Sequence, residues 1–305
     1  MTLETNITAD LAARVSPATV IRRDEPMARH TTLRVGGPAD IYAEPATEAD
    51  LAAVLKFCGE HDVRFFLLGR GSNLLVRDGG FRGVVICLAQ PEFSKIEVAG
   101  EKLRCGAGAR LKHVAIAARR NGLCGLEFLE GIPGSVGGAL RMNAGAMGGA
   151  MFDVVESVRV MDFAGGVREL LSRDMTVAYR GCATLQTGVA LGAVLRGRPD
   201  SVESIAQRMS AFSQKRWSSQ PAAPSAGCMF KNPPAIPAGK LIDELGLKGA
   251  RVGGARVSLE HGNFLVNDGN ATAAEVLELI GRLQARAKAE RGIELHTEVE
   301  IIGEA

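Results

Sequence analysis

The residues of this chain with the clearest chemical potential are glycines, and they gather between residues 121 and 150. Nine of these thirty residues are glycine, in a chain that has 37 glycines over 305 positions. Glycine adopts positive φ angles and lets the backbone approach a ligand closely, because it has no Cβ. The run GIPGSVGG at residues 131–138 could therefore present several backbone N–H groups to an anion such as a phosphate.

A flexible linker is the alternative interpretation of this glycine-rich stretch. Apolar residues are interleaved with the glycines, and a solvated linker would not bury them. These residues are Leu126, Phe128, Leu129, Ile132, Val136 and Leu140. The run is neither the GxGxxG dinucleotide fingerprint nor a phosphate loop that ends in Gly-Lys-Ser/Thr. We therefore interpret it as ordered backbone around a ligand, in a fold other than the Rossmann type.

A second glycine turn follows the short apolar run at residues 63–68. Its sequence is GRGSN, at residues 69–73, and another apolar run follows at residues 74–76. A strand, a glycine turn and a second strand form another candidate cradle for an anion.

The six cysteines are scattered singly, without a CxxC pair or a cluster of histidine and cysteine. This pattern argues against a zinc site and against a disulfide framework. We therefore expect no metal ion, and we expect most of the cysteines to be small buried hydrophobic residues.

Composition excludes several classes of function. Lysine and arginine number 36 against 34 acidic residues, so a net charge of +2 creates no global attraction for nucleic acid or an anionic membrane. No basic stripe with stacking aromatic residues is visible. The N-terminus lacks the charged and apolar regions of a signal peptide, and no run of about 18 apolar residues occurs. We expect a cytoplasmic protein without a membrane span.

Apolar periodicity predicts the elements that must position the glycine loops. A capping-box pattern at Thr47 and Asp50 starts one helix, and Gly122 stops another over residues 111–121. Thr272 caps a long helix that ends near residue 291. Strands are predicted at residues 154–162, 166–170, 188–195, 252–257 and 293–302, the first three in an antiparallel sheet, and a Pro/Ala linker at residues 220–227.

Four segments resemble the UDP-N-acetylenolpyruvoylglucosamine reductase family, also called UDP-N-acetylmuramate dehydrogenases. They are TTLRVGGPA at residues 31–39, LGRGSNLL at 68–75, GIPGSVGG to RMNAGA at 131–146, and PSAGCMFKNP at 224–233. The resemblance extends in unbroken order over residues 28–303. It implies an α+β protein with an FAD-binding fold of the vanillyl-alcohol-oxidase (PCMH) type in two subdomains, followed by a C-terminal α/β substrate domain.

The same resemblance implies domain bounds and a noncovalent FAD. The expected parts are an N-terminal lead-in (1–28), FAD-binding subdomains (29–88 and 89–198), and a substrate-binding domain (199–305) whose last strand (293–302) returns to the active site. The residues expected to hold the pyrophosphate are Gly69, Arg70, Gly71, Ser72, Asn73, Gly131, Ile132, Pro133, Gly134, Ser135, Gly137 and Gly138, with Asn143, Ala144 and Gly145 near the flavin.

Three catalytic positions follow from residue-by-residue matching to the family. VAYRG at residues 177–181 matches its Tyr-Arg motif without the tyrosine-loop insertion, which indicates the shorter, second type. Arg180 takes the position of the catalytic arginine and Glu298 that of the catalytic glutamate. Cys228 stands where the family has a catalytic serine. Without the resemblance, Arg180 would be a surface arginine, Cys228 inert packing and Glu298 a residue facing solvent.

The chemistry of enolpyruvyl reduction suits these residue types. Hydride adds to the terminal carbon, so negative charge collects at the adjacent carbon and carboxylate, where an arginine can bind it. A proton must then reach carbon from a positioned acid. A thiol, with an ordinary pKa of about 8.5, is a better acid than a serine hydroxyl. Cys228 can therefore replace serine, provided that it stays protonated.

The implied substrates are a UDP-sugar and NADPH. The residues expected to bind the UDP-sugar are Tyr179, Lys231, Asn232 and Asn263. The resemblance implies NADPH-dependent reduction of UDP-N-acetylglucosamine enolpyruvate to UDP-N-acetylmuramate, by a monomer. The alternatives are an FAD-dependent alcohol or sugar oxidase of the same fold, and a regulatory nucleotide-binding protein that has lost catalysis.

Overall fold

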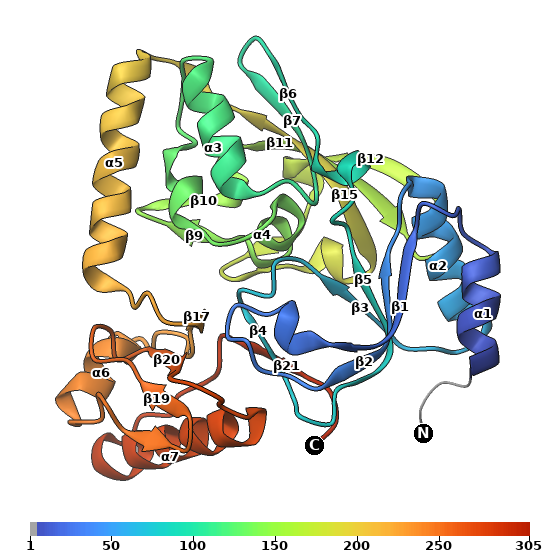
Figure 1. The fold of residues 1–305 in the computed structure, drawn as a ribbon. Coiled ribbons are helices and arrows are strands. Elements are labelled where there is room, and N and C mark those ends of the chain that lie inside the picture. Colours follow the sequence, from blue (N-terminus) through green and yellow to red (C-terminus); the bar gives the residue numbers. More distant parts are fainter. Residues whose placement is uncertain (1–4) are drawn as a thin grey trace. The chain divides into compact units, whose positions relative to one another are not determined.

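The structure, a computed structural model, describes residues 5–305, and the first four residues of the predicted lead-in lie outside it. Contacts between Cα atoms divide the chain into two compact units, and the chain passes between them at five points. Unit 1 contains residues 1–23, 41–70 and 83–216, and unit 2 contains residues 24–40, 71–82 and 217–305. Figure 1 labels the elements of both units. The domain bounds drawn from the sequence stay a prediction.

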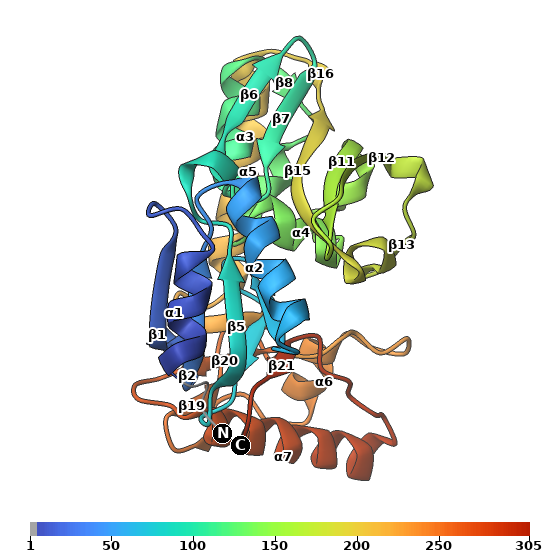
Figure 2. The ribbon, with the colours of Figure 1, turned by 90° about the vertical axis from the view of Figure 1, so that its right-hand side faces the viewer.

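An antiparallel sheet of five strands forms the centre of unit 1, in the order β12-β11-β15-β7-β6 (Figure 2). Its strands are β6 (Ile96–Ala99), β7 (Lys102–Gly106), β11 (Val155–Asp162), β12 (Val167–Leu171) and β15 (Gly188–Arg196). Every neighbouring pair is antiparallel. The antiparallel strands predicted over residues 154–195 are therefore confirmed.

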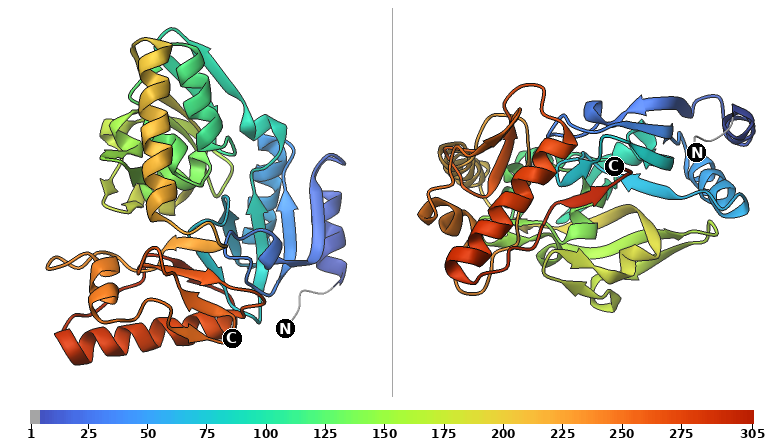
Figure 3. Two further views of the ribbon diagram at one scale, coloured as in Figure 1. Left: turned by 60° about the vertical axis from the view of Figure 1, so that its left-hand side comes forward. Right: turned by 90° about the horizontal axis from the view of Figure 1, so that it is seen from below.

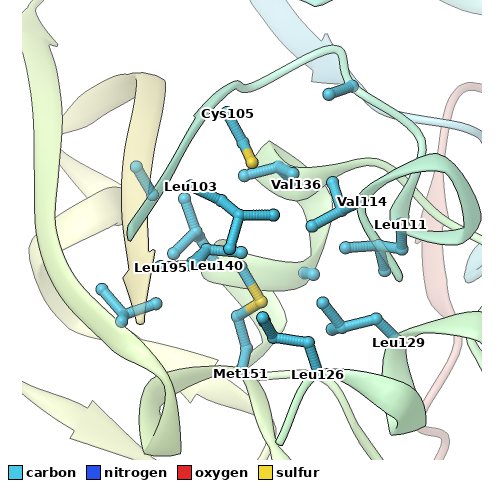
Figure 4. Close-up of a cluster of buried hydrophobic side chains, with 14 of the residues drawn as sticks. Leu103, Cys105, Leu111, Val114, Leu126, Leu129, Val136, Leu140, Met151 and Leu195 are labelled. Atoms are coloured by element: carbon cyan, nitrogen blue, oxygen red, sulfur yellow. The ribbon is translucent and has the colours of Figure 1, made fainter. Parts of the chain in front are cut away.

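Helices and short turns pack against this sheet and carry the long glycine-rich stretch. They are α3 (Leu111–Arg120), η3 (Glu127–Gly131), α4 (Val136–Met142) and α5 (Val202–Ser219). Figures 1 and 3 show α3 and α5 side by side. Figure 4 shows the buried core beneath them, where Leu126, Leu129 and Val136 meet strand residues such as Leu195. The apolar residues between the glycines are thus core residues, as the sequence predicted.

A second sheet has the strand order β1-β2-β5-β3, with β3 parallel to β5. Its strands are β1 (Val20–Pro26), β2 (Pro38–Glu44), β3 (Phe65–Leu68) and β5 (Phe81–Cys87). Helices α1 (Thr5–Ala13) and α2 (Glu48–Glu60) contribute Leu11 and Leu51 to its core. The predicted capping box is confirmed, because Thr47 accepts from the backbone of Asp50. The sequence did not predict β1, an edge strand with charged residues in its middle.

Unit 2 has an antiparallel sheet in the order β17-β20-β19-β18. Its strands are β17 (Ser225–Cys228), β18 (Arg251–Val252), β19 (Ala255–Val257) and β20 (Phe264–Asn267). Helices α6 (Ala238–Glu244) and α7 (Ala273–Arg291) share its core, and Figure 3 shows α7 running along the sheet. A parallel pair, β4 (Leu74–Val76) and β21 (Glu300–Ile302), completes the unit.

Three element predictions in unit 2 need correction. The linker predicted at residues 220–227 ends in β17, because Ser225 pairs with Val266 of β20. The strand predicted at residues 252–257 is the hairpin of β18 and β19, since Gly253 has a φ of +51° and turns the chain. The strand predicted at residues 293–302 is regular only in β21.

Two-stranded pairs and single turns complete unit 1. The pairs are β8 (Leu123–Cys124) with β16 (Arg198–Pro199), β9 (Gly145–Ala146) with β10 (Gly149–Ala150), and β13 (Val177–Ala178) with β14 (Gly181–Cys182). Gly122, with a φ of +63°, follows α3 and confirms the predicted glycine stop.

Close backbone approach explains two glycines of unit 2. A Cβ at Gly71, where φ is +61°, would collide with the carbonyl oxygen of His30 and come within 2.8 Å of Thr31 Cα. A Cβ at Gly37 would collide with the carbonyl group of Asp78. These glycines let the segment at residues 24–40 lie directly against the segment at residues 71–82, both within unit 2.

We expect Gly71→Ala to destabilise the protein by about 2–4 kcal/mol, because it adds both a strained φ and a clash with backbone atoms. The midpoint and slope of urea unfolding measure this loss. Gly59→Ala is the matched control, since Gly59 lies inside α2 with no atom within 4 Å of its Cβ position. It should gain about 0.5 kcal/mol from helix propensity. Equal stabilities of the two variants would contradict the prediction.

Candidate functional site

A cavity of about 520 Å³ opens inside unit 1. Residues of both predicted anion cradles line it, namely Gly69 and Arg70 from the first, and Ser135, Gly137 and Gly138 from the second. Its volume lies within the range of ligand pockets, about 300–1,000 Å³. The structure therefore brings together two glycine segments that are separated by 57 residues in the sequence.

The backbone of the two cradles is bare where they meet. A Cβ added to Gly69 would lie 3.1 Å from Ser135 Oγ and 3.7 Å from Gly138 Cα. Gly137 donates its N–H to the carbonyl oxygen of Ala107 at 2.8 Å, and a Cβ there would lie 3.1 Å from the Ala107 Cβ. Side chains at Gly69 and Gly137 would press against neighbouring protein atoms, so these glycines let the cavity-lining segments pack closely together.

The charge lining the cavity is positive. Arg70, Arg110, His113 and Arg141 line it, and none of the described lining residues is acidic. Arg141 is anchored by a hydrogen bond from its Nη1 to the carbonyl oxygen of Leu185, at 3.1 Å. An anionic group is therefore the ligand that this lining favours.

Apolar residues form the rest of the cavity wall. Leu67, Ile86 and Val189 line it, and so does Cys87. Burial raises the pKa of the Cys87 thiol, which keeps it neutral. Burial also raises the pKa of Tyr42, whose hydroxyl donates to Glu44 at 2.8 Å. The cavity thus combines a cationic, glycine-lined part with a neutral apolar part, as an amphipathic cofactor with a phosphate group requires.

Helix α5 holds the segment that enters the second cradle. Arg208 forms an ion pair with the buried Glu127 at 2.8 Å and another with Asp200 at 2.6 Å. Arg216 donates from Nη1 to the carbonyl oxygen of Gly131 at 3.0 Å, and burial lowers the pKa of its guanidinium. Two arginines on one helix thus fix the start of the glycine loop.

The structure distributes the other predicted cofactor residues around this cavity and in unit 2. Ile132, Pro133 and Gly134 lie between Gly131 and the lining residue Ser135 without lining the cavity themselves. Asn143 ends α4 with a φ of +39°, accepts from the N–H of Phe152 at 3.2 Å and donates to Ala178 at the same distance. Ala144 and Gly145 lead from it into β9, while Gly71, Ser72 and Asn73 belong to unit 2.

Arg180 lies at the tip of a hairpin in unit 1. Strands β13 and β14 pair Ala178 with Gly181, which leaves Tyr179 and Arg180 as the two turn residues. Arg180 has a φ of +57°, and its guanidinium carbon lies 5.2 Å from the centre of the Tyr179 ring. A left-handed arginine is uncommon, and such strain concentrates at functional sites. The Tyr179 side chain is 68% exposed.

Unit 2 brings the segment of Cys228 next to the segment of Glu298. The Glu298 N–H donates to the carbonyl oxygen of Met229 at 2.8 Å, and the Lys231 N–H donates to that of His296 at 2.9 Å. Between these two bonds, Phe230 and Thr297 form an antiparallel bridge. Two residues predicted to be catalytic and one predicted to bind substrate therefore lie on neighbouring extended segments.

A threonine of the first family segment holds the approach to Cys228. Thr32 Oγ1 donates to the carbonyl oxygen of Ser225 at 2.6 Å, and the Thr32 N–H donates to that of Gly71 at 3.1 Å. Gly227 has a φ of +76°, and its Cβ position lies 3.6 Å from the Ser72 carbonyl oxygen. Three segments that resemble the reductase family thus meet within unit 2.

Two residues predicted to bind substrate have structural hydrogen bonds. Asn263 is 2% exposed, and its side chain accepts from the N–H of Phe230 at 2.9 Å and donates to the carbonyl oxygen of Phe230 at 2.8 Å. Asn232 Oδ1 accepts from the N–H of Ala238 at the start of α6, at 3.0 Å. These bonds fix the segment that carries Cys228 and Lys231, and direct contact with substrate stays a prediction.

Sequence reasoning did not identify three of the basic residues that line the cavity. Arg110 and His113 lie at the start of α3, and Arg141 lies in the last turn of α4. Nothing in the local sequence shows that the start of α3 meets the glycine turn, because the contact depends on the backbone bridge between Arg110 and Ser135. The sequence signal that could have helped is the apolar face of α3, because it indicates which side of the helix is buried and therefore on which side Arg110 and His113 lie.

Two family profiles match the chain. An FAD binding domain matches residues 39–171, and the C-terminal domain of UDP-N-acetylenolpyruvoylglucosamine reductase matches residues 220–302. The fold and the cavity therefore define an FAD-binding flavoprotein, as predicted. The α+β fold class with an FAD-binding fold of the vanillyl-alcohol-oxidase type is confirmed.

Relatives extend the similarity over almost the whole chain. Reductases from Moorella thermoacetica and Heliobacterium modesticaldum are 43% and 47% identical to it, over 92% and 93% of this chain and 93% and 91% of theirs. The crystal structure of the reductase from Thermus caldophilus has 40% identity and a TM-score of 0.82, and covers 93% of this chain and 99% of its own. The chain belongs to the UDP-N-acetylenolpyruvoylglucosamine reductase family.

Two further properties concern residues 5–305. None of the helices described is both long and apolar enough to cross a membrane. The described part of the chain also contains no group of three or more His, Cys, Asp or Glu residues that could hold a metal ion.

We expect Gly138→Val to abolish FAD binding while the protein still folds. Gly138 lines the cavity, and its Cβ position has only Ser135 Oγ within 4 Å, at 3.6 Å. The added methyl groups would therefore occupy ligand space without meeting the core. Flavin absorbance per mole of purified protein measures binding, and circular dichroism measures folding.

Gly131→Ala is the control for this variant, since no atom lies within 4 Å of its Cβ position and it does not line the cavity. This control should keep its flavin. Full FAD content in Gly138→Val would show that the cavity is not the cofactor site.

Proposed function

We propose that this protein reduces UDP-N-acetylglucosamine enolpyruvate to UDP-N-acetylmuramate in peptidoglycan biosynthesis, with noncovalent FAD and with NADPH as hydride donor. Membership of the reductase family supports the reaction. The observation that carries the proposal is the cavity in unit 1, where two glycine cradles, three arginines and a histidine converge. This lining suits the diphosphate of FAD, and the apolar wall suits its rings.

The cavity lined by Gly69, Arg70 and Gly138 would hold FAD, which would supply hydride transfer between NADPH and the enolpyruvyl group. We propose that Arg180 binds the substrate carboxylate and stabilises the negative charge that develops beside it. Cys228 donates a proton to carbon, and Glu298 orients or protonates the enol. The short distance between the backbone of Met229 and that of Glu298 supports a joint role for the segments that carry the last two residues.

The proposal assigns substrate binding to Tyr179, Lys231, Asn232 and Asn263. Lys231 provides a point charge suited to a phosphate or a carboxylate, and the ring of Tyr179 is exposed beside Arg180. Asn232 and Asn263 support the same segment through their backbone bonds. We further propose that residues 199–305 form the substrate-binding domain and that the enzyme works as a cytoplasmic monomer without nucleic-acid or membrane partners.

Purified protein should be yellow, and it should oxidise NADPH only when UDP-N-acetylglucosamine enolpyruvate is present. Denaturation should release the FAD, because it is bound noncovalently. Loss of NADPH absorbance, together with mass spectrometry of the sugar product, measures the reaction. Turnover of an alcohol or sugar with oxygen, without NADPH, would instead identify an oxidase of the same fold. NADPH oxidation that ignores the sugar nucleotide would refute the proposal.

We expect the wild-type enzyme to lose activity at a lower alkaline pH than Cys228→Ser does. A thiol ordinarily loses its proton near pH 8.5, whereas a serine hydroxyl stays protonated throughout the accessible range. The thiolate cannot donate a proton, so the wild-type activity, which needs the protonated thiol, falls as the pH rises. The pH dependence of flavin reoxidation by substrate measures this difference.

Cys228→Ala provides the reference without a proton donor at this position and should reoxidise slowly at every pH. Identical alkaline limbs for wild type and Cys228→Ser, or normal reoxidation in Cys228→Ala, would exclude Cys228 as the acid.

A further inference from the structure

Asn73 contacts the segment of Glu298 through both its side chain and its backbone. The sequence places Asn73 in a glycine turn expected to hold a cofactor. In the structure its Nδ2 donates to the carbonyl oxygen of Glu298 at 3.1 Å, and its own carbonyl oxygen accepts from the N–H of Glu300 at 3.1 Å. Both contacts lie within unit 2.

These contacts extend a regular pairing between strands. After Asn73, strand β4 pairs in parallel with β21, with Glu300 opposite Leu74. On its other side, the Glu298 N–H donates to the carbonyl oxygen of Met229 at 2.8 Å. The backbone of Glu298 is thus held from two directions. Its N–H donates to the backbone of Met229, in the segment after Cys228, and its carbonyl oxygen accepts from the side chain of Asn73.

The Asn73 side chain acts on the peptide group that follows Glu298. A hydrogen bond to the Glu298 carbonyl oxygen restrains this peptide group and, with the bond from the Glu298 N–H to Met229, holds the backbone from which the Glu298 side chain extends. Displacement of a catalytic group by about 1 Å can cost about 100-fold in rate. The bonds that Glu298 and Glu300 form with the backbone of Met229 and Asn73 persist in any side-chain variant. The bond from the Asn73 side-chain amide, in contrast, is lost when that amide is replaced.

We propose that Asn73 is a positioning residue for Glu298, which sets the carboxyl group for the protonation half of the reaction. The inference rests on the proposed function, in which Glu298 acts on the enol. It assigns Asn73 a different role from Gly69 and Arg70 of the same turn, which line the cavity in unit 1. Its effect should therefore be confined to the step in which substrate reoxidises the flavin.

The experiment separates the two half-reactions in Asn73→Asp, which keeps the shape of the side chain and replaces its donor with an acceptor. We expect flavin reoxidation by UDP-N-acetylglucosamine enolpyruvate to slow about 10- to 100-fold, through kcat rather than KM. FAD affinity and flavin reduction by NADPH should change less than about threefold, well under the tenfold that 1.4 kcal/mol represents. Stopped-flow absorbance follows both half-reactions.

Asn267→Asp is the matched control. Asn267 also lies in unit 2 and donates from Nδ2 to a backbone carbonyl oxygen, that of Leu33, at 3.2 Å. Its substitution removes a bond of the same kind away from Glu298, so reoxidation should stay close to the wild-type rate. If Asn73→Asp does not fold, Asn73→Ser removes the same contact without adding a charge and is measured in the same way.

A double-mutant cycle with Glu298→Gln tests whether Asn73 acts through Glu298. In the Glu298→Gln background, Asn73→Asp should slow reoxidation by less than about threefold, because the group that it positions is already disabled. Full additivity of the two effects would overturn the proposal. So would a parallel loss of FAD affinity or of NADPH-driven reduction, which would make Asn73 a cofactor contact. Failure of wild-type reduced enzyme to react with the substrate would refute the proposed function instead.

Discussion

The site depends on one constraint: backbone segments must approach each other closely at glycines, where no side chain keeps them apart. Gly69 lies so close to the second cradle that an added Cβ would come within 3.1 Å of Ser135 Oγ and 3.7 Å of Gly138 Cα. Glycine contributes no packing of its own, so the neighbouring elements must hold these loops. In unit 1 this support comes from Arg208 and Arg216 of α5 and from the backbone of Ala107. Rigidity of the cradle is therefore supplied by residues outside it.

In unit 2, hydrogen bonds from side chains to backbone groups hold the corresponding segments in place. Thr32 holds Ser225, Asn73 holds Glu298, and Asn263 holds both polar groups of the Phe230 backbone. Each is a short polar side chain that fixes a main-chain segment beside a residue with a proposed chemical role. These polar residues therefore stabilise the backbone of the segments that carry Cys228 and Glu298.

Local sequence predicted those features whose cause is local. Capping of α2, the glycine stop after α3 and the existence of strands β11 and β15 depend on a few adjacent residues, and they are confirmed. Strand β1 was missed because charged side chains mask an edge strand, and β17 because its partner Val266 is distant in the chain. The glycine cradles were predictable from composition, whereas Arg110, His113 and Arg141 reach the cavity only through tertiary packing.

At Arg180 the backbone conformation of the hairpin opposes the role that we propose for its side chain. A left-handed turn residue is favourable for glycine and acceptable for asparagine, while an arginine there costs of order 1 kcal/mol. Mutational drift toward glycine would therefore be favoured by folding alone. The role that we propose for the Arg180 charge would oppose that drift, so the persistence of arginine among homologues would record the strength of that selection.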